Sequence, residues 1–205
     1  MIVAQRIVSR ICQEYGISPE PSIRIMGPST SAIPNAYVRF SHRNSVQATI
    51  RIDQRLFNKA YEDALDKSIA HEMAHYRHHD LGYIGLWDDI CARLGGSKAK
   101  IKRNTNTIIY IIREIRADIE GAQYSIVERD TIIQEFNKLH KQWGVEKDTL
   151  TAQFCNHYPP FDVRGKFVGE HTFFTSKTLD DILELYAGYD FDKNSIYQLF
   201  VTNES

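Results

Sequence analysis

Residues 68–80 read SIAHEMAHYRHHD, and within this stretch His71 and His75 enclose Glu72 in the pattern H-E-x-x-H. On an α-helix, positions i and i+4 share one face with an offset of about 40°, so the two imidazoles can reach one ion together. Two neutral imidazoles and a carboxylate suit zinc, with a fourth position left open for water. The pattern therefore predicts that His71 and His75 bind zinc and that Glu72, beside them, is the general base.

The flanks of this stretch predict a helix over about 62–79. Its apolar side is formed by residues at helical spacing, namely Leu65, Ile69, Ala70, Met73 and Ala74. Histidines next to that side need a partner, since unpaired polar groups are costly to bury. The competing interpretation is a chance match in a histidine-rich polar helix, so the prediction depends on a third ligand. A metzincin centre would need glycine at 78 and a ligand at 81, but the chain has His78 and Leu81.

The third ligand is predicted from the segment REIRADIEGAQ, residues 113–123. Glu114 follows an apolar run and shares a helix face with Asp118, four residues on. Small residues on the same side would let this helix approach the H-E-x-x-H helix closely, namely Ala117 and Gly121. We expect Glu114 to complete the zinc site and Asp118 to accept the free ring N–H of a ligand histidine. The alternative is that both acids are half-exposed and pair with neighbouring arginines.

The composition of the 205-residue chain is typical of a soluble globular protein, with 42% hydrophobic and 25% charged residues. The net charge of −1 gives no global attraction to nucleic acid or to an anionic membrane. The run SKAKIKRN, residues 97–104, is locally basic, but we interpret it as a solvated loop rather than a nucleic-acid site. The longest apolar run is far shorter than a membrane span. Three scattered cysteines indicate reduced thiols in a cytoplasmic protein, namely Cys12, Cys91 and Cys155.

The pattern along the chain predicts one mainly helical α+β domain over residues 1–205, with a zincin core at about 20–165 and a C-terminal helical appendage at about 166–205. Besides the motif helix, we expect helices at about 2–15, 105–126, 130–143, 178–187 and 194–201, and extended segments at 22–26, 36–40, 46–52 and 166–174. Segments 36–40 and 46–52 flank a polar turn and predict a hairpin. The sheet near the N-terminus is therefore expected to be small and antiparallel.

Four short motifs together resemble one family. They are PNAYV (34–38), IAHEMAH (69–75), EIRAD (114–118) and, more loosely, HYPPFDVR (157–164). This set resembles the gluzincin metallopeptidases of the HtpX and CAAX-prenyl-protease type. The resemblance implies that two histidines and a glutamate bind zinc while an aspartate supports one of them; here these are His71, His75, Glu114 and Asp118. Members of that family are usually embedded in membranes, whereas this chain has no membrane-spanning stretch.

The same resemblance implies further roles. Asn35, Ala36 and Tyr37 would form an edge strand that binds the substrate backbone as an added strand. A gluzincin-type centre also needs a donor for the developing oxyanion, and His157, before the stiff Pro-Pro pair, is the candidate, with Tyr158 as its alternative. Arg164 would bind substrate or pair with a carboxylate near the metal. HYPPFDVR has one residue more between its histidine and arginine than the family pattern.

These observations favour a zinc-dependent peptidase in which Glu72 is the general base for a metal-activated water, and its substrate would be a protein or peptide. A second relative is the ImmA/IrrE type of regulatory protease, which acts on repressors and carries similar helices. The segment AQYSIVERD, residues 122–130, departs from that type. A non-catalytic zinc-binding interaction module is a third possibility, although such a module would not need Glu72.

Overall fold

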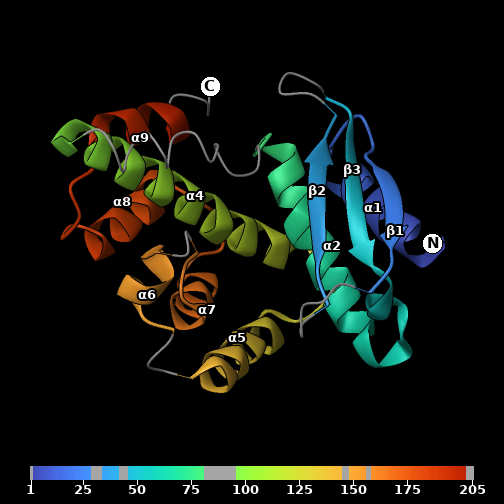
Figure 1. Ribbon diagram of the computed structural model, residues 1–205. Helices are drawn as coiled ribbons and strands as arrows, with labels where there is room; N and C mark the ends of the chain where they lie inside the picture. Colours follow the sequence, from blue (N-terminus) through green and yellow to red (C-terminus); the bar gives the residue numbers. More distant parts are fainter. Residues whose placement is uncertain are drawn as a thin grey trace.

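The computed structural model describes residues 2–28, 34–41, 46–80, 96–144, 148–155 and 158–201. The N-terminal part consists of α1 (Ile2–Tyr15), β1 (Ser22–Met26), β2 (Ala36–Phe40), β3 (Ala48–Asp53), two short 3-10 turns (Gln54–Phe57 and Lys59–Tyr61) and α2 (Glu62–Arg77). The C-terminal part is helical, with α4 (Gly96–Tyr124), α5 (Arg129–Trp143), α6 (Leu150–Cys155), α7 (Phe161–Glu170), α8 (Ser176–Leu185) and α9 (Lys193–Phe200). The mainly helical α+β class is confirmed (Figure 1).

The sheet has the strand order β1-β3-β2. β2 and β3 pair antiparallel, with Val38 opposite Ile50, so the hairpin is confirmed. β1 instead pairs with β3 in parallel, with Ile23 opposite Ile50. The sheet is therefore mixed rather than wholly antiparallel. β1 and β2 occupy its two edges, and β3 lies between them, parallel to β1 and antiparallel to β2.

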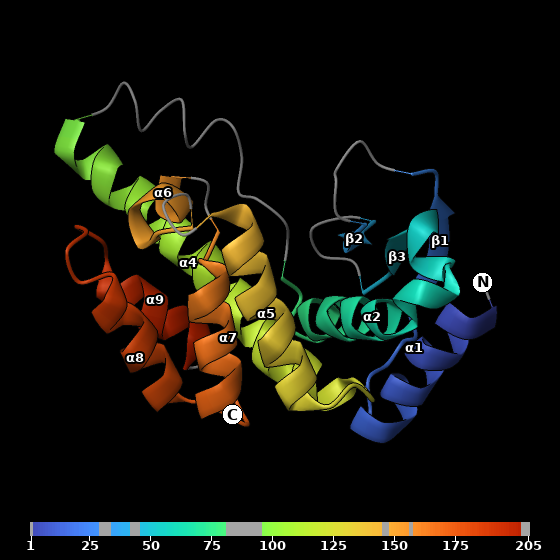
Figure 2. The same ribbon diagram turned by 90° about the horizontal axis from the view of Figure 1, so that it is seen from below.

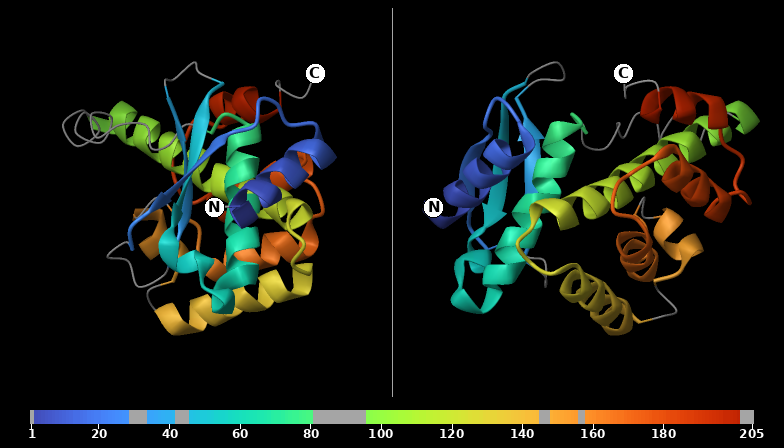
Figure 3. Two further views of the ribbon diagram at one scale, coloured as in Figure 1. Left: turned by 90° about the vertical axis from the view of Figure 1, so that its right-hand side faces the viewer. Right: turned by 180° about the vertical axis from the view of Figure 1, so that it is seen from behind.

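One core lies between the sheet and the helices α1 and α2, which cover the same face of it (Figure 2). Alternate residues of β3 point into this core, among them Ile50 and Ile52, both fully buried. α1 begins and ends where its apolar stripe predicts, and it crosses α2 (Figure 3, left). α2 thus has one side in this core and the opposite side free to meet α4.

Helix α4 packs against both parts of the molecule (Figure 1). Ala117 and Tyr124 join the N-terminal core. Isoleucines on its other side pack with α7, α8 and α9, namely Ile108, Ile111, Ile112, Ile115 and Ile119. The two faces of α4 therefore contact both cores, and the single domain stays a prediction.

Two local predictions are wrong. α4 begins at Gly96, so the basic run 97–104 lies in its first turns and not in a loop. The predicted extended segment 166–174 is wrong over residues 166–170, because Phe161–Glu170 is α7. The valines and phenylalanines there follow helical spacing on the buried side, and Gly165 allows close packing, since a Cβ at this position would lie 3.2 Å from Cβ of Phe136. α6 was not predicted. Within the described residues, no helix is long and apolar enough to cross a membrane.

Candidate metal centre

The three predicted ligands converge where α2 and α4 pack together. The Nε2 atoms of His71 and His75 lie 3.0 Å apart. Nε2 of His75 is 3.4 Å from Oε1 of Glu114, and Nε2 of His71 is 3.6 Å from Oε2 of the same carboxylate. Zinc bonds of about 2.0–2.1 Å in a tetrahedron would put neighbouring donors about 3.3–3.4 Å apart. The spacing of the three groups therefore fits one tetrahedral ion.

Two aspartates fix which ring nitrogens face that point. Nδ1 of His71 lies 2.9 Å from Oδ1 of Asp118, and Nδ1 of His75 lies 3.1 Å from Oδ2 of Asp80. A carboxylate can only accept here, so both Nδ1 atoms carry the hydrogen when the rings are neutral. The two Nε2 lone pairs then face each other at 3.0 Å, and a proton or a metal ion between them would remove the repulsion. This donor chemistry fits a bound metal ion.

Asp80 is a supporting residue that the sequence did not reveal. Its position follows from the way in which α2 ends. The N–H of Asp80 donates to the carbonyl of His75, and the N–H of His79 to that of Tyr76, while His79 has a left-handed φ of 52°. This is a Schellman motif, which turns the chain back over the last helical turn. This turn places the carboxylate of Asp80 beside the ring of His75. Nη2 of Arg116 donates a hydrogen bond of 2.7 Å to Oδ1 of Asp80.

The carboxylates around the histidines are buried and strongly perturbed. Burial alone would raise the pKa of Glu114, but hydrogen bonds with His71 and His75 hold it well below its usual value. Burial is also the main influence on Glu72, and here it wins, so the pKa of Glu72 is raised. Glu114 is thus held as a carboxylate, the form in which it could bind a metal ion, while the environment of Glu72 favours proton uptake.

The side chain of Glu72 is oriented by the sheet. Its Oε2 accepts a hydrogen bond of 2.6 Å from the N–H of Val38 in β2. The register places Asn35 and Ser41 in hydrogen bonds with β3, so the alternate residues Ala36, Val38 and Phe40 direct their backbone groups to the outer edge of β2, where no other described strand pairs. The predicted strand thus lies beside the candidate base, and Tyr37 is 41% exposed. The N–H of Ala36 is taken by the side chain of Asn35, at 2.8 Å.

Arg164, expected to bind substrate, is buried beneath the site. Its Nε and Nη2 donate to the two carboxylate oxygens of Asp118 at 2.5 and 2.6 Å. It also donates to the hydroxyl of Tyr158. Arg164 therefore orients the aspartate that supports His71, which is the other role expected for it. His157 lies outside the described residues.

Tyr110 is a further side chain near the centre that the sequence did not single out. It precedes Glu114 by four residues on α4 and therefore shares its face. Burial, followed by the charges of Glu114 and Glu72, raises its pKa. Its hydroxyl has no hydrogen-bond partner among the described residues. The signal in the sequence was its spacing from Glu114.

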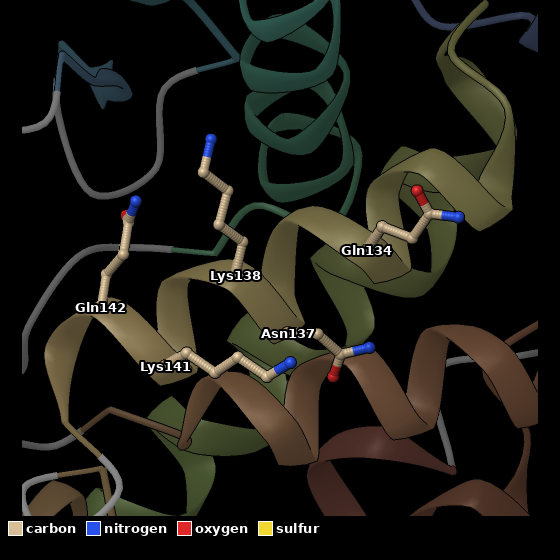
Figure 4. Close-up of a pocket in the computed structure, with 5 residues that line it drawn as sticks. All are labelled: Gln134, Asn137, Lys138, Lys141 and Gln142. Carbon is tan, nitrogen blue, oxygen red and sulfur yellow. The ribbon is translucent and has the colours of Figure 1, made fainter.

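A hollow of about 530 Å³ lies along α5 (Figure 4). Its described lining is polar and comes from one helix: Gln134, Asn137, Lys138, Lys141 and Gln142. The side chain of Lys138 extends towards α2 (Figure 4). None of the metal-binding candidates lines this hollow, so it is described separately from the centre.

The candidate centre is a pair of closely packed helices that place two histidines and Glu114 together, with the candidate base Glu72 beside them. Residues 3–94 match the sequence model of peptidase family M48. The Protease HtpX homolog of Campylobacter concisus (strain 13826) is 28% identical over 118 residues, which cover 52% of this chain and 39% of the relative. The resemblance to HtpX-like peptidases of family M48 is thereby confirmed, although the chain spans well under half the length of that relative. No solved structure matches.

Proposed function

We propose that this chain is a zinc-dependent peptidase of the gluzincin type, with His71, His75 and Glu114 as metal ligands and a protein or peptide as substrate. The observation that carries the proposal is the head-to-head arrangement of the two Nε2 atoms, 3.0 Å apart, with Glu114 against both. The M48 match over residues 3–94 supports it.

The residues around the ion would divide the work. When bound, zinc would polarise the scissile carbonyl and acidify a water molecule. Glu72, held by the N–H of Val38 through one oxygen, would take the proton of the attacking water through the other and pass it to the departing amine. Asp118 and Asp80 would keep the histidines in the tautomer that binds metal.

The substrate would lie along the free edge of β2, where Asn35, Ala36 and Tyr37 are placed. The carbonyls of Ala36, Val38 and Phe40 and the N–H of Phe40 are the outward groups of β2 that remain for an added strand. The donor to the developing oxyanion would be His157, as the family resemblance implies, or Tyr110, which precedes Glu114 by four residues on the same face of α4.

The test combines metal analysis with hydrolysis of a diverse peptide pool. Glu114→Gln should lower the bound zinc from about one per chain, because a ligand is lost. Glu72→Gln should keep the zinc and lose about 10²- to 10⁴-fold in rate, because an amide cannot take the proton. Full zinc occupancy in Glu114→Gln would overturn the ligand assignment. A zinc-loaded wild type without hydrolysis of any peptide would instead favour an interaction module.

A further inference from the structure

A second group of metal-binding side chains lies away from the proposed centre. His140 is in the last turn of α5, Asp148 precedes α6, and Asp162 is in the first turn of α7. The helices α5, α6 and α7 lie near one another below α4 (Figure 3, right). The group therefore joins three segments that are separate in the sequence.

The donor atoms of the three side chains face one another. Nδ1 of His140 is 2.6 Å from Oδ2 of Asp148 and 4.0 Å from Oδ1 of Asp162. All three donors lie within 4.8 Å of one another. One imidazole with two carboxylates suits a divalent transition-metal ion, because imidazole is a poor ligand for magnesium or calcium.

The environment of Asp148 is a separate observation that points to a bound cation. It is only 3% exposed. Its Oδ2 accepts from His140 and from the N–H of Phe161, the latter at 2.8 Å. Its Oδ1 is fully buried and has no hydrogen-bond partner among the residues that the structure describes. A buried carboxylate oxygen without a partner is costly, and a cation beside it would remove that cost.

We propose that His140, Asp148 and Asp162 form a second site for a divalent transition-metal ion, distinct from the one between α2 and α4. Asp162 is half-exposed, so an ion can enter from solvent and keep water ligands there. Binding would displace the Nδ1 hydrogen of His140, which now donates to Asp148, and release it as a proton.

A metal ion at this second site would fix the position of α7. Asp148 already caps the first N–H of this helix at Phe161, and Asp162 follows directly. Arg164, two residues further, holds Asp118 and through it His71. An ion that ties α7 to the end of α5 would therefore fix the segment that carries Arg164.

The experiment counts zinc bound to chelator-treated protein by calorimetric titration and native mass spectrometry. Wild type should take two equivalents, and Asp162→Asn and His140→Gln one each. His71→Ala should also take one, and the double variant His71→Ala/Asp162→Asn none. Asp130→Asn, an exposed acid at the opposite end of α5, is the matched control and should take two.

Each outcome separates the two sites. A single equivalent in wild type that His71→Ala loses and Asp162→Asn keeps would overturn the second site and leave the proposed peptidase centre standing. A single equivalent in wild type that Asp162→Asn loses and His71→Ala keeps would support the second site and overturn the proposed centre between α2 and α4. A second equivalent weakened equally by Asp162→Asn and Asp130→Asn would be non-specific surface binding and would also overturn the proposal. As an independent readout, added zinc should raise the melting temperature of His71→Ala and leave that of the double variant unchanged.

Discussion

Gly121 of α4 lies directly against the backbone of His71 in α2. A Cβ built at Gly121 would come within 2.9 Å of Cα of His71 and 3.0 Å of its N atom. These obstacles are backbone atoms of a buried helix, so they cannot move aside as a flexible side chain would. The absence of a side chain at 121 therefore sets how closely Glu114 can approach the two histidines.

Gly121→Ala should consequently push α4 from α2 and weaken metal binding. Alanine favours helices by about 1 kcal/mol over glycine, so any loss of stability would come from the clash. The measurements are the zinc affinity and the melting temperature, both of which should fall. Gly169→Ala is the matched control, because its Cβ would meet Cδ1 of Ile133 at 3.5 Å, an ordinary contact. Equal zinc affinities for the two variants and wild type would show that the close approach of α4 to α2 does not limit zinc binding.

Asp118→Asn and Asp80→Asn should each weaken zinc binding by about 10- to 100-fold, because each removes the charge that orients one histidine. Competition with a chromogenic chelator measures the affinity. Asp66→Asn is the control, since Asp66 is equally buried but bonds to Arg10 and Ser125 rather than to a ligand histidine. That variant should lose stability and keep its zinc affinity. If Asp66→Asn lowers the affinity as much as the others, the effect is one of folding.

Tyr110→Phe and His157→Phe should identify the donor to the oxyanion. Removal of one oxyanion donor costs about 10²- to 10³-fold in kcat in other hydrolases. Zinc should stay bound in both variants, because neither residue is a proposed ligand. Whichever variant shows that loss, with zinc content unchanged, carries the role. Affinity for a phosphonate transition-state analogue should fall in parallel, whereas KM should change little. If neither variant differs from wild type, the donor is another group.

Cys12 should be an unreactive thiol in the native protein. Burial, helped by the charge of Glu20, raises its pKa from 9.0 to about 11. At pH 8 its thiolate fraction is then about 100-fold below that of an ordinary thiol, so alkylation should slow by about that factor. The thiol must be neutral when folded but ionises above about pH 9 when unfolded, so the free energy of unfolding should decrease as the pH rises from 9 to 11. Alkylation in a Cys91→Ser/Cys155→Ser background measures the rate, and the urea-unfolded chain is the reference; equal rates would contradict the burial.

Periodicity accounts for the parts of the centre that could be predicted. His71 and His75, like Glu114 and Asp118, are four residues apart on a helix, so their common face follows from the helical repeat alone. The close approach of the two helices was also foreseeable, because Ala117 and Gly121 leave room for it. What these patterns could not give is the partner of each aspartate, which depends on packing.

The features that escaped prediction depend on backbone turns and on tertiary contacts. Asp80 reaches His75 only because His79 adopts a left-handed conformation, which costs a non-glycine residue about 1 kcal/mol and leaves no periodic trace. β1 pairs with β3 in parallel because the chain passes from one edge of the sheet to the other between β1 and β2. A short apolar segment carries no signal for that crossing. Residues 166–170 were expected to be extended, and Phe167 and Val168 do have high strand propensity, yet the cap from Asp148 and the packing on α5 make these residues part of a helix.

The free edge of β2 has a consequence for how copies of the protein behave towards one another. An exposed edge strand is a template on which a second molecule can extend the sheet, the usual start of aggregation. Here two of the three outward N–H groups are already bonded within the molecule, that of Ala36 to Asn35 and that of Val38 to Glu72. The contacts of Asn35 and Glu72 thus make this edge a poor template for an extended strand from a second copy, whereas the carbonyls of Ala36, Val38 and Phe40 and the N–H of Phe40 remain for a short peptide.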